Sequence, residues 1–299
     1  MPCMRCLRQP EIANNSGGEH MKNSRHRMHK MAVRVHGELV RLAYSVCLSP
    51  DANPPVILLH GMGSSRLAYQ PLMDAWPFPG SVYALDMPGF GASGHLRQRH
   101  TLSDYVEAVH AFIVALGLDS VVLLGHSFGG MVAGEVVAHH PQQVRGAVLV
   151  SSAGLVPPSN VFVPSRYICL NRIGIWVTGL SYFGDRMVTA LGMDSLQLTA
   201  EDRWRLRYGW RKAIEMARMG QFYEDAAFFR GVVRSGRPVV LIHGERDPVF
   251  SYAAVRDVVG VHFPILTMPQ VGHLPFDQNF PRFCELLVDA MAIIQTETS

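Results

Sequence analysis

Short, continuously apolar runs recur along this chain and alternate with segments whose apolar residues follow a helical period. Runs of this kind are typical of strands that are buried on both faces of a parallel sheet. The runs lie at residues 56–59, 81–85, 121–124, 147–150, 239–242 and 264–268. Because a helix between two parallel strands forms a right-handed crossover, the alternation predicts a mostly parallel α/β sheet.

The most regular helical pattern follows the second of these runs. Between residues 102 and 116 the apolar positions are mostly three or four apart, Thr101 precedes them as an N-cap and Gly117 follows them as a stop. Two further helices are expected at residues 130–140 and from about residue 279 to residue 294. Helices of this kind should flank the sheet.

Two more strands are indicated at the start of the folded part. Residues 33–36 and 39–44 predict a β-hairpin that turns around Gly37 and Glu38. With the six apolar runs they bring the expected sheet to eight strands. The hairpin supplies its antiparallel edge.

Residues 154–232 interrupt the alternation of strands and helices. They are rich in aromatic side chains and mainly helical in pattern. We interpret them as a helical cap inserted after the sixth strand, so that residues 32–153 and 233–299 form the core. Trp176 and Trp204 are candidates for lining a substrate pocket under this cap, although any single aromatic there more often packs between helices.

The first 31 residues are polar and lack the apolar core of a secretory signal. They carry six basic and two acidic side chains, so the chain's net charge of +3 becomes −1 in the remainder. The folded part therefore gives no indication of nucleic-acid binding, and no apolar run is long enough to cross a bilayer. We expect a disordered basic tail, and Met1, Met21, Met28 and Met31 all remain open as the translation start.

The five cysteines show no disulfide framework. Cys3 and Cys6 have the spacing of a metal or redox pair, but no second pair accompanies them. Scattered cysteines in an odd number favour a reducing compartment, so we expect a cytoplasmic protein without a metal or another cofactor.

One motif lies between the apolar run at 121–124 and the helix expected after it. This motif is Gly125-His126-Ser127-Phe128-Gly129. It predicts a strand, a sharp turn and a helix with a serine at the apex, where side chains at Gly125 and Gly129 would collide with the crossing backbone. Such an elbow holds the Ser127 hydroxyl above the sheet, at a helix N-terminus.

A serine hydroxyl is a weak nucleophile unless a base takes its proton and a third group orients that base. His273 is the best candidate for the base, because it follows the last strand at the carboxyl edge of the sheet, where Ser127 is also expected. Asp247 is the best candidate for the orienting acid, since it follows the preceding strand and comes before a proline that favours extended backbone. Glu245 is the alternative acid.

From residue 31 onward the chain resembles the α/β-hydrolase superfamily, in the form that carries a helical cap. The motifs behind this resemblance are the elbow at 125–129, the His60-Gly61-Met62-Gly63 loop, the glycine-rich segment 86–94, and Asp247 and His273. The resemblance implies an α/β-hydrolase fold with an eight-stranded, mostly parallel sheet. It also implies that Ser127, Asp247 and His273 form a catalytic triad, in the chain order of this fold.

The resemblance further implies an oxyanion hole formed by the backbone N–H groups of Met62 and Phe128. Gly61 and Gly63 would let that loop approach a substrate closely, and Gly61 and Leu274 are additional substrate-binding candidates.

Other polar residues near these motifs have plainer interpretations. His60 and His126 flank the expected site, and the resemblance makes them structural more often than catalytic. Asp86 is expected to anchor its own turn rather than to replace Asp247.

We therefore expect a cofactor-free serine hydrolase that cleaves an ester-like bond of a small or medium apolar substrate through an acyl-enzyme. Lactonase, thioesterase, amidase and hydrolysis of C–C bonds in meta-cleavage products are alternatives on the same triad. A non-hydrolytic lyase and a ligand receptor form a second class. A homodimer is left open, as are the substrate and the pathway.

Overall fold

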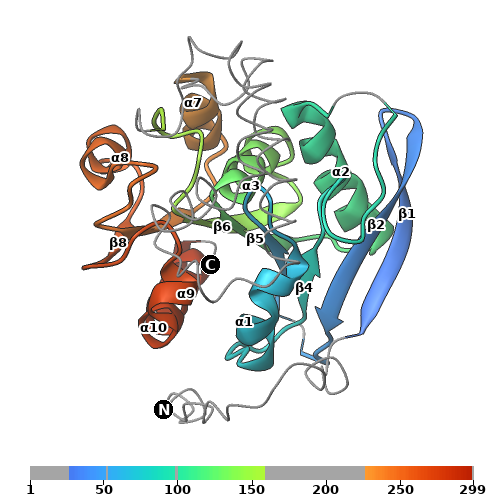
Figure 1. The fold of residues 1–299 in the computed structure, drawn as a ribbon, viewed down its shortest axis with the longest axis horizontal. Helices are drawn as coiled ribbons and strands as arrows, with labels where there is room; N and C mark the ends of the chain where they lie inside the picture. Colours follow the sequence, from blue (N-terminus) through green and yellow to red (C-terminus); the bar gives the residue numbers. More distant parts are fainter. Residues whose placement is uncertain (1–26, 52, 98–99, 159–225, 298–299) are drawn as a thin grey trace, which may run out of the picture.

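The structure is a computed structural model that describes residues 27–51, 53–97, 100–158 and 226–297 (Figure 1). In these residues eight strands form one sheet in the order β1-β2-β4-β3-β5-β6-β7-β8. Neighbours are antiparallel from β1 to β4 and parallel from β4 to β8, which confirms the mostly parallel sheet. The strands are β1 Met28–Val35, β2 Glu38–Cys47, β3 Val56–Leu59, β4 Val82–Leu85, β5 Val121–His126, β6 Val144–Val150, β7 Val239–Gly244 and β8 Ile265–Met268.

Helices lie on both sides of this sheet (Figure 1). They are η2 Arg66–Tyr69, α1 Gln70–Asp74, α2 Leu102–Ala115, α3 Phe128–His139, α7 Ala226–Arg234, α8 Tyr252–Val259, α9 Pro275–Gln278 and α10 Phe280–Glu297. The expected helices correspond to α2, α3 and α10. The sequence pattern did not reveal η2, α1, α8 and α9, because elements of four to eight residues are too short for a helical period to stand out.

Alternating residues of the buried strands separate the core into two layers. Ile57 and Leu59 join the cluster that contains α2, α3, α7 and α8 side chains, whereas Val56 and Leu58 join the cluster that contains α1 and α10 side chains. This follows from the two-residue period of a strand. All four are at least 98% buried, and each such side chain contributes roughly 1.5–3 kcal/mol to folding.

The N-terminal hairpin differs from its prediction in two ways. Its turn is formed by His36 and Gly37, with φ of 46° and 86°, and Glu38 already pairs with Val35. Positive φ at both central residues is the requirement of a type I′ turn, and Gly37 is the second residue of this turn rather than the first. β1 also begins at Met28, so residues 28–31 belong to the edge strand and not to the tail.

The start of α2 is confirmed in detail. The Thr101 hydroxyl accepts a hydrogen bond from the Asp104 N–H, and the Asp104 carboxylate accepts one from the Thr101 N–H at 2.7 Å. This reciprocal pair is a capping box. Gly117, at φ 67°, follows the helix as expected.

Most of the predicted cap, including Trp176 and Trp204, lies outside the described residues. Its two described ends belong to the core. Leu155 and Val156 are buried in the cluster below α3, and Phe228 and Val232 of α7 pack into the same cluster. The two ends of the interval thus supply core side chains, and the bounds of the cap at residues 154–232 stay a prediction.

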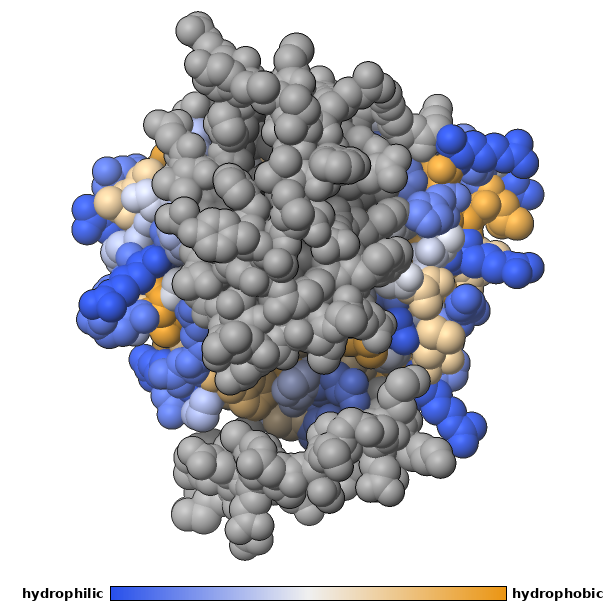
Figure 2. Space-filling view, viewed as in Figure 1, coloured by the Kyte–Doolittle hydropathy of each residue, from blue (hydrophilic) through white to orange (hydrophobic). Residues whose placement is uncertain are grey.

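Among the described residues, no helix combines the length and the apolar character needed to cross a membrane. Figure 2 shows hydrophilic side chains interspersed with apolar ones around the margin of the visible face.

Candidate active site

Ser127 lies between the end of β5 and the start of α3, with φ 51° and ψ −114°. Positive φ at a residue other than glycine costs roughly 1–3 kcal/mol and persists only where the surroundings enforce it. Here the Ser127 N–H donates to Val150 O at 2.9 Å, and the Ser127 carbonyl accepts from the Ala153 N–H at 3.0 Å. Hydrogen bonds with the end of the neighbouring strand β6 and with the segment that follows it therefore hold the elbow in place.

The two flanking glycines are needed for steric reasons, as predicted. A Cβ at Gly125 would meet the carbonyl of Gly129, and a Cβ at Gly129 would meet the carbonyl of Leu59. Both obstacles are backbone atoms, which cannot turn away as a flexible side chain can. The strand and the helix can thus cross only where neither residue has a side chain.

His273 lies in the loop after β8, and its ring reaches Ser127 across the top of the sheet. Its Nε2 is 3.0 Å from Ser127 Oγ, and its Nδ1 is 2.9 Å from Asp247 Oδ2. A carboxylate only accepts hydrogen bonds, so Nδ1–H donates to Asp247 and Nε2 accepts from the Ser127 hydroxyl. His273 is 95% buried, which keeps this chain of hydrogen bonds away from bulk water.

Asp247 is held by hydrogen bonds from its own loop. Its Oδ1 accepts from the Val249 and Phe250 N–H groups at 2.8 and 3.0 Å. Burial acts to raise the pKa of Asp247, but the hydrogen bond from His273 and the electrostatic interactions with His273 and His243, together with the Phe250 N–H, lower the pKa below its usual value. Asp247 is therefore ionised at neutral pH.

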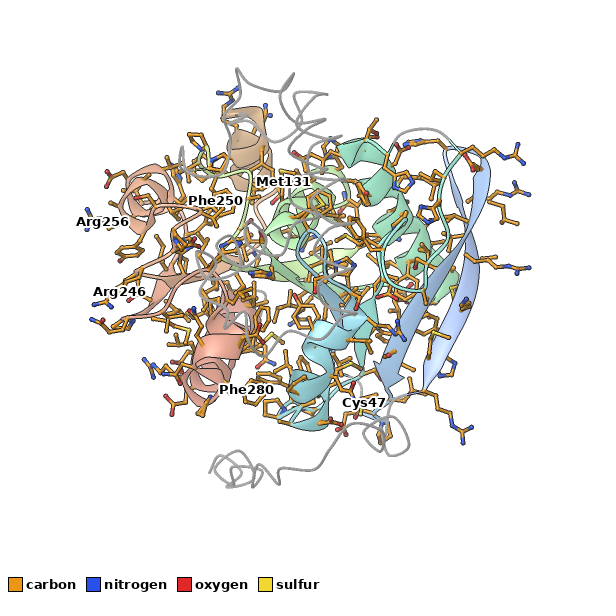
Figure 3. The ribbon with its side chains drawn as sticks, in the orientation of Figure 1. Cys47, Met131, Arg246, Phe250, Arg256 and Phe280 are labelled. Carbon is orange, nitrogen blue, oxygen red and sulfur yellow. The ribbon has the colours of Figure 1, made fainter. Side chains whose placement is uncertain are left out.

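The alternative acid, Glu245, is exposed, and Arg246 beside it points outward from the molecule (Figure 3). The Arg246 N–H donates to Val271 O at 2.9 Å, which ties the loop after β7 to the loop after β8. This bond between loops keeps Asp247 opposite His273. The geometry therefore favours Asp247 over Glu245 as the partner of His273.

His243 is a residue near the site to which sequence reasoning assigned no role. Its Nε2–H donates to Phe250 O at 2.9 Å and lies 3.6 Å from Asp247 Oδ2, while its Nδ1 is buried without a hydrogen-bond partner. Burial lowers the pKa of His243. A neutral ring there supports the loop that carries Asp247 without adding a permanent charge. The sequence feature that could have indicated this role is the position of His243 four residues before Asp247.

The loop 60–63 lies beside the elbow. Both ring nitrogens of His60 bond to backbone, since Nε2 accepts from the Met87 N–H at 3.1 Å and Nδ1–H donates to Gly61 O at 2.8 Å. His60 is thus structural, as expected. A Cβ on Gly61 would lie 3.6 Å from Ser127 Cβ, and Gly63 has φ 79°. Met62 is half-buried between these two glycines.

Asp86 follows β4 and anchors its own turn, as expected. Its Oδ2 accepts from the Ala92 N–H at 2.8 Å. It also pairs with the Arg66 side chain at 2.5 Å and accepts from the Arg66 N–H at 2.6 Å. These partners leave Asp86 no role beside His273.

Leu274 directly follows His273 and is half-buried against the cluster that contains α10. The other substrate-binding candidates, Trp176 and Trp204, lie outside the described residues. Of the substrate-binding candidates, Gly61 and Leu274 thus lie in segments adjacent to Ser127 and His273.

Within the described part of the chain, one group has the donor set of a metal site. Ligand atoms of Glu107, His110 and His140 lie within 4.8 Å of one another between α2 and the end of α3. The two imidazoles stack with centroids 3.8 Å apart and planes 9° apart. A bound ion lies near the plane of each ligating ring, and two stacked parallel rings cannot share one. The group fits an aromatic pair better than a metal centre.

Comparisons with known proteins agree with this architecture. Over 273 residues the chain is 23% identical to an uncharacterized protein of Mycobacterium tuberculosis, which covers 85% of this chain and 78% of that protein. Carboxylesterase CesB from Bacillus subtilis superposes with a TM-score of 0.66 at 18% identity, covering 89% of this chain and 92% of the other. Naproxen esterase from Bacillus subtilis gives 0.67 at 17% identity, with the same coverage.

The sequence profile of the alpha/beta hydrolase family matches residues 56–286, which is well over half of the chain. The match begins at β3 and extends into α10. It therefore includes the elbow, the loop after β7 that carries Asp247 and the loop after β8 that carries His273. The chain belongs to the alpha/beta hydrolase family.

Proposed function

We propose that the protein is a serine hydrolase that cleaves an ester-like bond of a small or medium apolar substrate through an acyl-enzyme. One observation carries the proposal: Ser127 Oγ, the His273 ring and Asp247 form a continuous hydrogen-bonded chain of 3.0 and 2.9 Å. These distances allow a proton to move from the hydroxyl to the imidazole while the carboxylate holds the ring in place.

In the first half of the reaction, Ser127 Oγ bonds to the substrate carbonyl carbon and its proton passes to His273 Nε2. The carbonyl π electrons move to oxygen and give a tetrahedral oxyanion. When these electrons form the carbonyl π bond again, the bond between the carbonyl carbon and the leaving alkoxide breaks, and His273 Nε2–H gives the alkoxide its proton. The products are an alcohol and the Ser127 acyl ester, with Asp247 stabilising the transient imidazolium.

In the second half, a water molecule replaces the alcohol. His273 Nε2 takes one proton of this water while the water oxygen attacks the acyl carbon. The second tetrahedral species collapses, the Ser127 Oγ–carbon bond breaks, and Oγ receives the proton from His273. The carboxylic acid leaves and the enzyme returns to its starting state.

The oxyanion needs hydrogen-bond donors that are already in place when it forms. The backbone N–H groups of Phe128, at the start of α3, and of Met62, in the loop beside the elbow, are the proposed donors. The proximity of Gly61 to Ser127 supports this assignment, because it brings the loop to the same side of the nucleophile. Loss of one such donor typically costs about 100- to 1,000-fold in rate.

Trp176, Trp204 and Leu274 remain the proposed contacts for the apolar part of the substrate. Lactonase, thioesterase and amidase activity would use the same three residues. Hydrolysis of C–C bonds is less favoured, since the related C–C hydrolases usually carry asparagine before the nucleophile and this chain carries His126.

The proposal is tested with p-nitrophenyl esters of graded acyl length and a fluorophosphonate probe. Wild type should hydrolyse a short or medium ester and become labelled at Ser127, and Ser127→Ala and His273→Ala should lose both properties. Full activity in either variant would overturn the assignment of residues. Folded wild type that resists labelling would instead indicate a ligand receptor. Lactones, thioesters and amides in the same screen separate the alternative hydrolases.

A further inference from the structure

His126 directly precedes Ser127 and contacts two other segments, the loop that carries His273 and the loop 60–63. Its Nε2–H donates to the backbone carbonyl of His273 at 2.8 Å, a bond between residues 147 positions apart. Its ring also meets the edge of the Phe276 ring, with centroids 5.0 Å apart and planes at 88°. His126 is therefore fixed against the loop that carries His273.

The opposite side of the same ring faces the loop 60–63. A Cβ built on Gly61 would lie 2.7 Å from His126 Nδ1, which is closer than real Cβ atoms approach. The backbone at Gly61 has no positive φ, so glycine is required there by this contact and not by conformation. The glycine that sequence reasoning assigned to the substrate thus makes room for His126.

The charge state of His126 agrees with this packing. Burial and the nearby His273 ring lower the pKa of His126 to about 3, so the ring is neutral at physiological pH. Because Nε2 carries the proton donated to His273, Nδ1 presents a lone pair toward Gly61. An uncharged ring can pack between the two loops without a counter-ion.

We propose that His126 is a positioning residue that sets the spacing between the His273 loop and the loop 60–63 around Ser127. It touches neither the hydroxyl proton nor the substrate, and it acts through the His273 carbonyl on one side and Gly61 on the other. This inference rests on the proposed function, because spacing matters only if the two loops supply the base and the oxyanion donor.

The first test compares His126→Phe with His126→Gln. Phenylalanine keeps a ring of similar size but cannot donate to the His273 carbonyl, whereas glutamine retains an N–H donor. With rates normalised to the sites titrated by the fluorophosphonate, His126→Phe should lower kcat about 10- to 100-fold with little change in KM, because small displacements of reacting groups have effects of that size. His126→Gln should recover most of kcat.

The second test uses the contact with Gly61. Gly61→Ala should lower kcat in the wild-type background, since the new methyl group displaces the His126 ring. In a His126→Ala background the ring is absent, so the same methyl group should have a much smaller effect. Such non-additivity is the signature of two residues in direct contact. Additive effects of the two changes would contradict the proposal.

A matched control is His100→Gln, because His100 is also a buried histidine, and its Nε2 accepts from the Leu96 N–H while its Nδ1 bonds to the Tyr105 hydroxyl at 3.1 Å. It should change thermal stability without changing kcat per titrated site. A His126→Phe enzyme with wild-type kcat would overturn the inference. Wild type that neither hydrolyses esters nor is labelled would overturn the proposed function, and so the two failures are distinguishable.

Discussion

Two aspartates follow strands at the carboxyl edge of the same sheet, and the residues that surround them differ. Asp86, after β4, pairs with the guanidinium of Arg66 and accepts two backbone N–H groups, one from Arg66 and one from Ala92 in its own turn. Asp247, after β7, accepts two backbone N–H groups in the same manner, but its side-chain partner is His273. Both carboxylates are at least 93% buried.

The partner decides what each buried carboxylate can do. A guanidinium stays protonated at every physiological pH, so the pair of Asp86 and Arg66 keeps its charges and can only hold structure. An imidazole gains and loses a proton near neutral pH, so Asp247 can orient His273 and stabilise its charged form during a reaction. Burial therefore does not distinguish the proposed catalytic acid from the structural one, whereas the side chain opposite each carboxylate does.

The largest expected effect separates the two aspartates by activity. Asp247→Asn should lower kcat about 10,000-fold, because the amide favours the wrong tautomer of His273 while leaving the geometry nearly unchanged. Ester hydrolysis, normalised by circular dichroism to folded protein, measures the loss. An Asp247→Asn enzyme within tenfold of wild type would remove the distinction between the two sites.

Asp86→Ala should produce the complementary result, a loss of stability. Removing one member of a buried ion pair leaves the Arg66 charge without its partner, which typically costs about 3–5 kcal/mol. Urea unfolding measures this change, and the activity of the molecules that remain folded should stay within a few-fold of wild type. The double change Arg66→Met with Asp86→Leu should recover part of the stability, since no uncompensated charge is then buried.

The site that contains His126 and Asp247 should also respond to acid differently from the pair of Asp86 and Arg66. His126 has a pKa of about 3 in the fold, whereas an unfolded histidine has a pKa of about 6.5, so the unfolded chain binds an extra proton between these values. Folding stability therefore decreases as pH falls from about 6.5 toward 3. Wild type should lose up to about 1.4 kcal/mol per pH unit more than His126→Gln in this window.

Urea midpoints between pH 4.5 and 7.5 measure this difference. Equal slopes for wild type and His126→Gln would show that the fold does not lower the pKa of His126. The pair of Arg66 and Asp86 is present in both proteins, so it cancels from the difference.

The smallest expected effect concerns the residue beside Asp247. Glu245→Gln should change kcat/KM by less than about twofold, since an exposed side chain with no contact to His273 contributes little to orienting it. The same ester assay gives the comparison with Asp247→Asn. A loss of tenfold or more would reopen the choice between the two acids.

The sequence alone predicted the strands of the sheet, Ser127 and His273, and it favoured Asp247 over Glu245 as the third interacting residue. Continuous apolar runs predicted strands buried on both faces, because alternate side chains must fill two separate layers. The elbow was predictable for a similarly local reason, because the strand and the helix cross so closely around Ser127 that only glycine fits at positions 125 and 129. The order of strands and loops then placed Asp247 and His273 at the edge where Ser127 lies.

Only the tertiary structure decided how these loops are held together. The bond from His126 to the His273 carbonyl joins positions 147 residues apart, and no periodicity or spacing encodes it. The pairing of Arg66 with Asp86 and the hydrogen bond that His60 accepts from the Met87 N–H are likewise non-local. Backbone pattern is set by neighbours along the chain, whereas the partner of a buried polar group is set by whichever segment the fold brings opposite it.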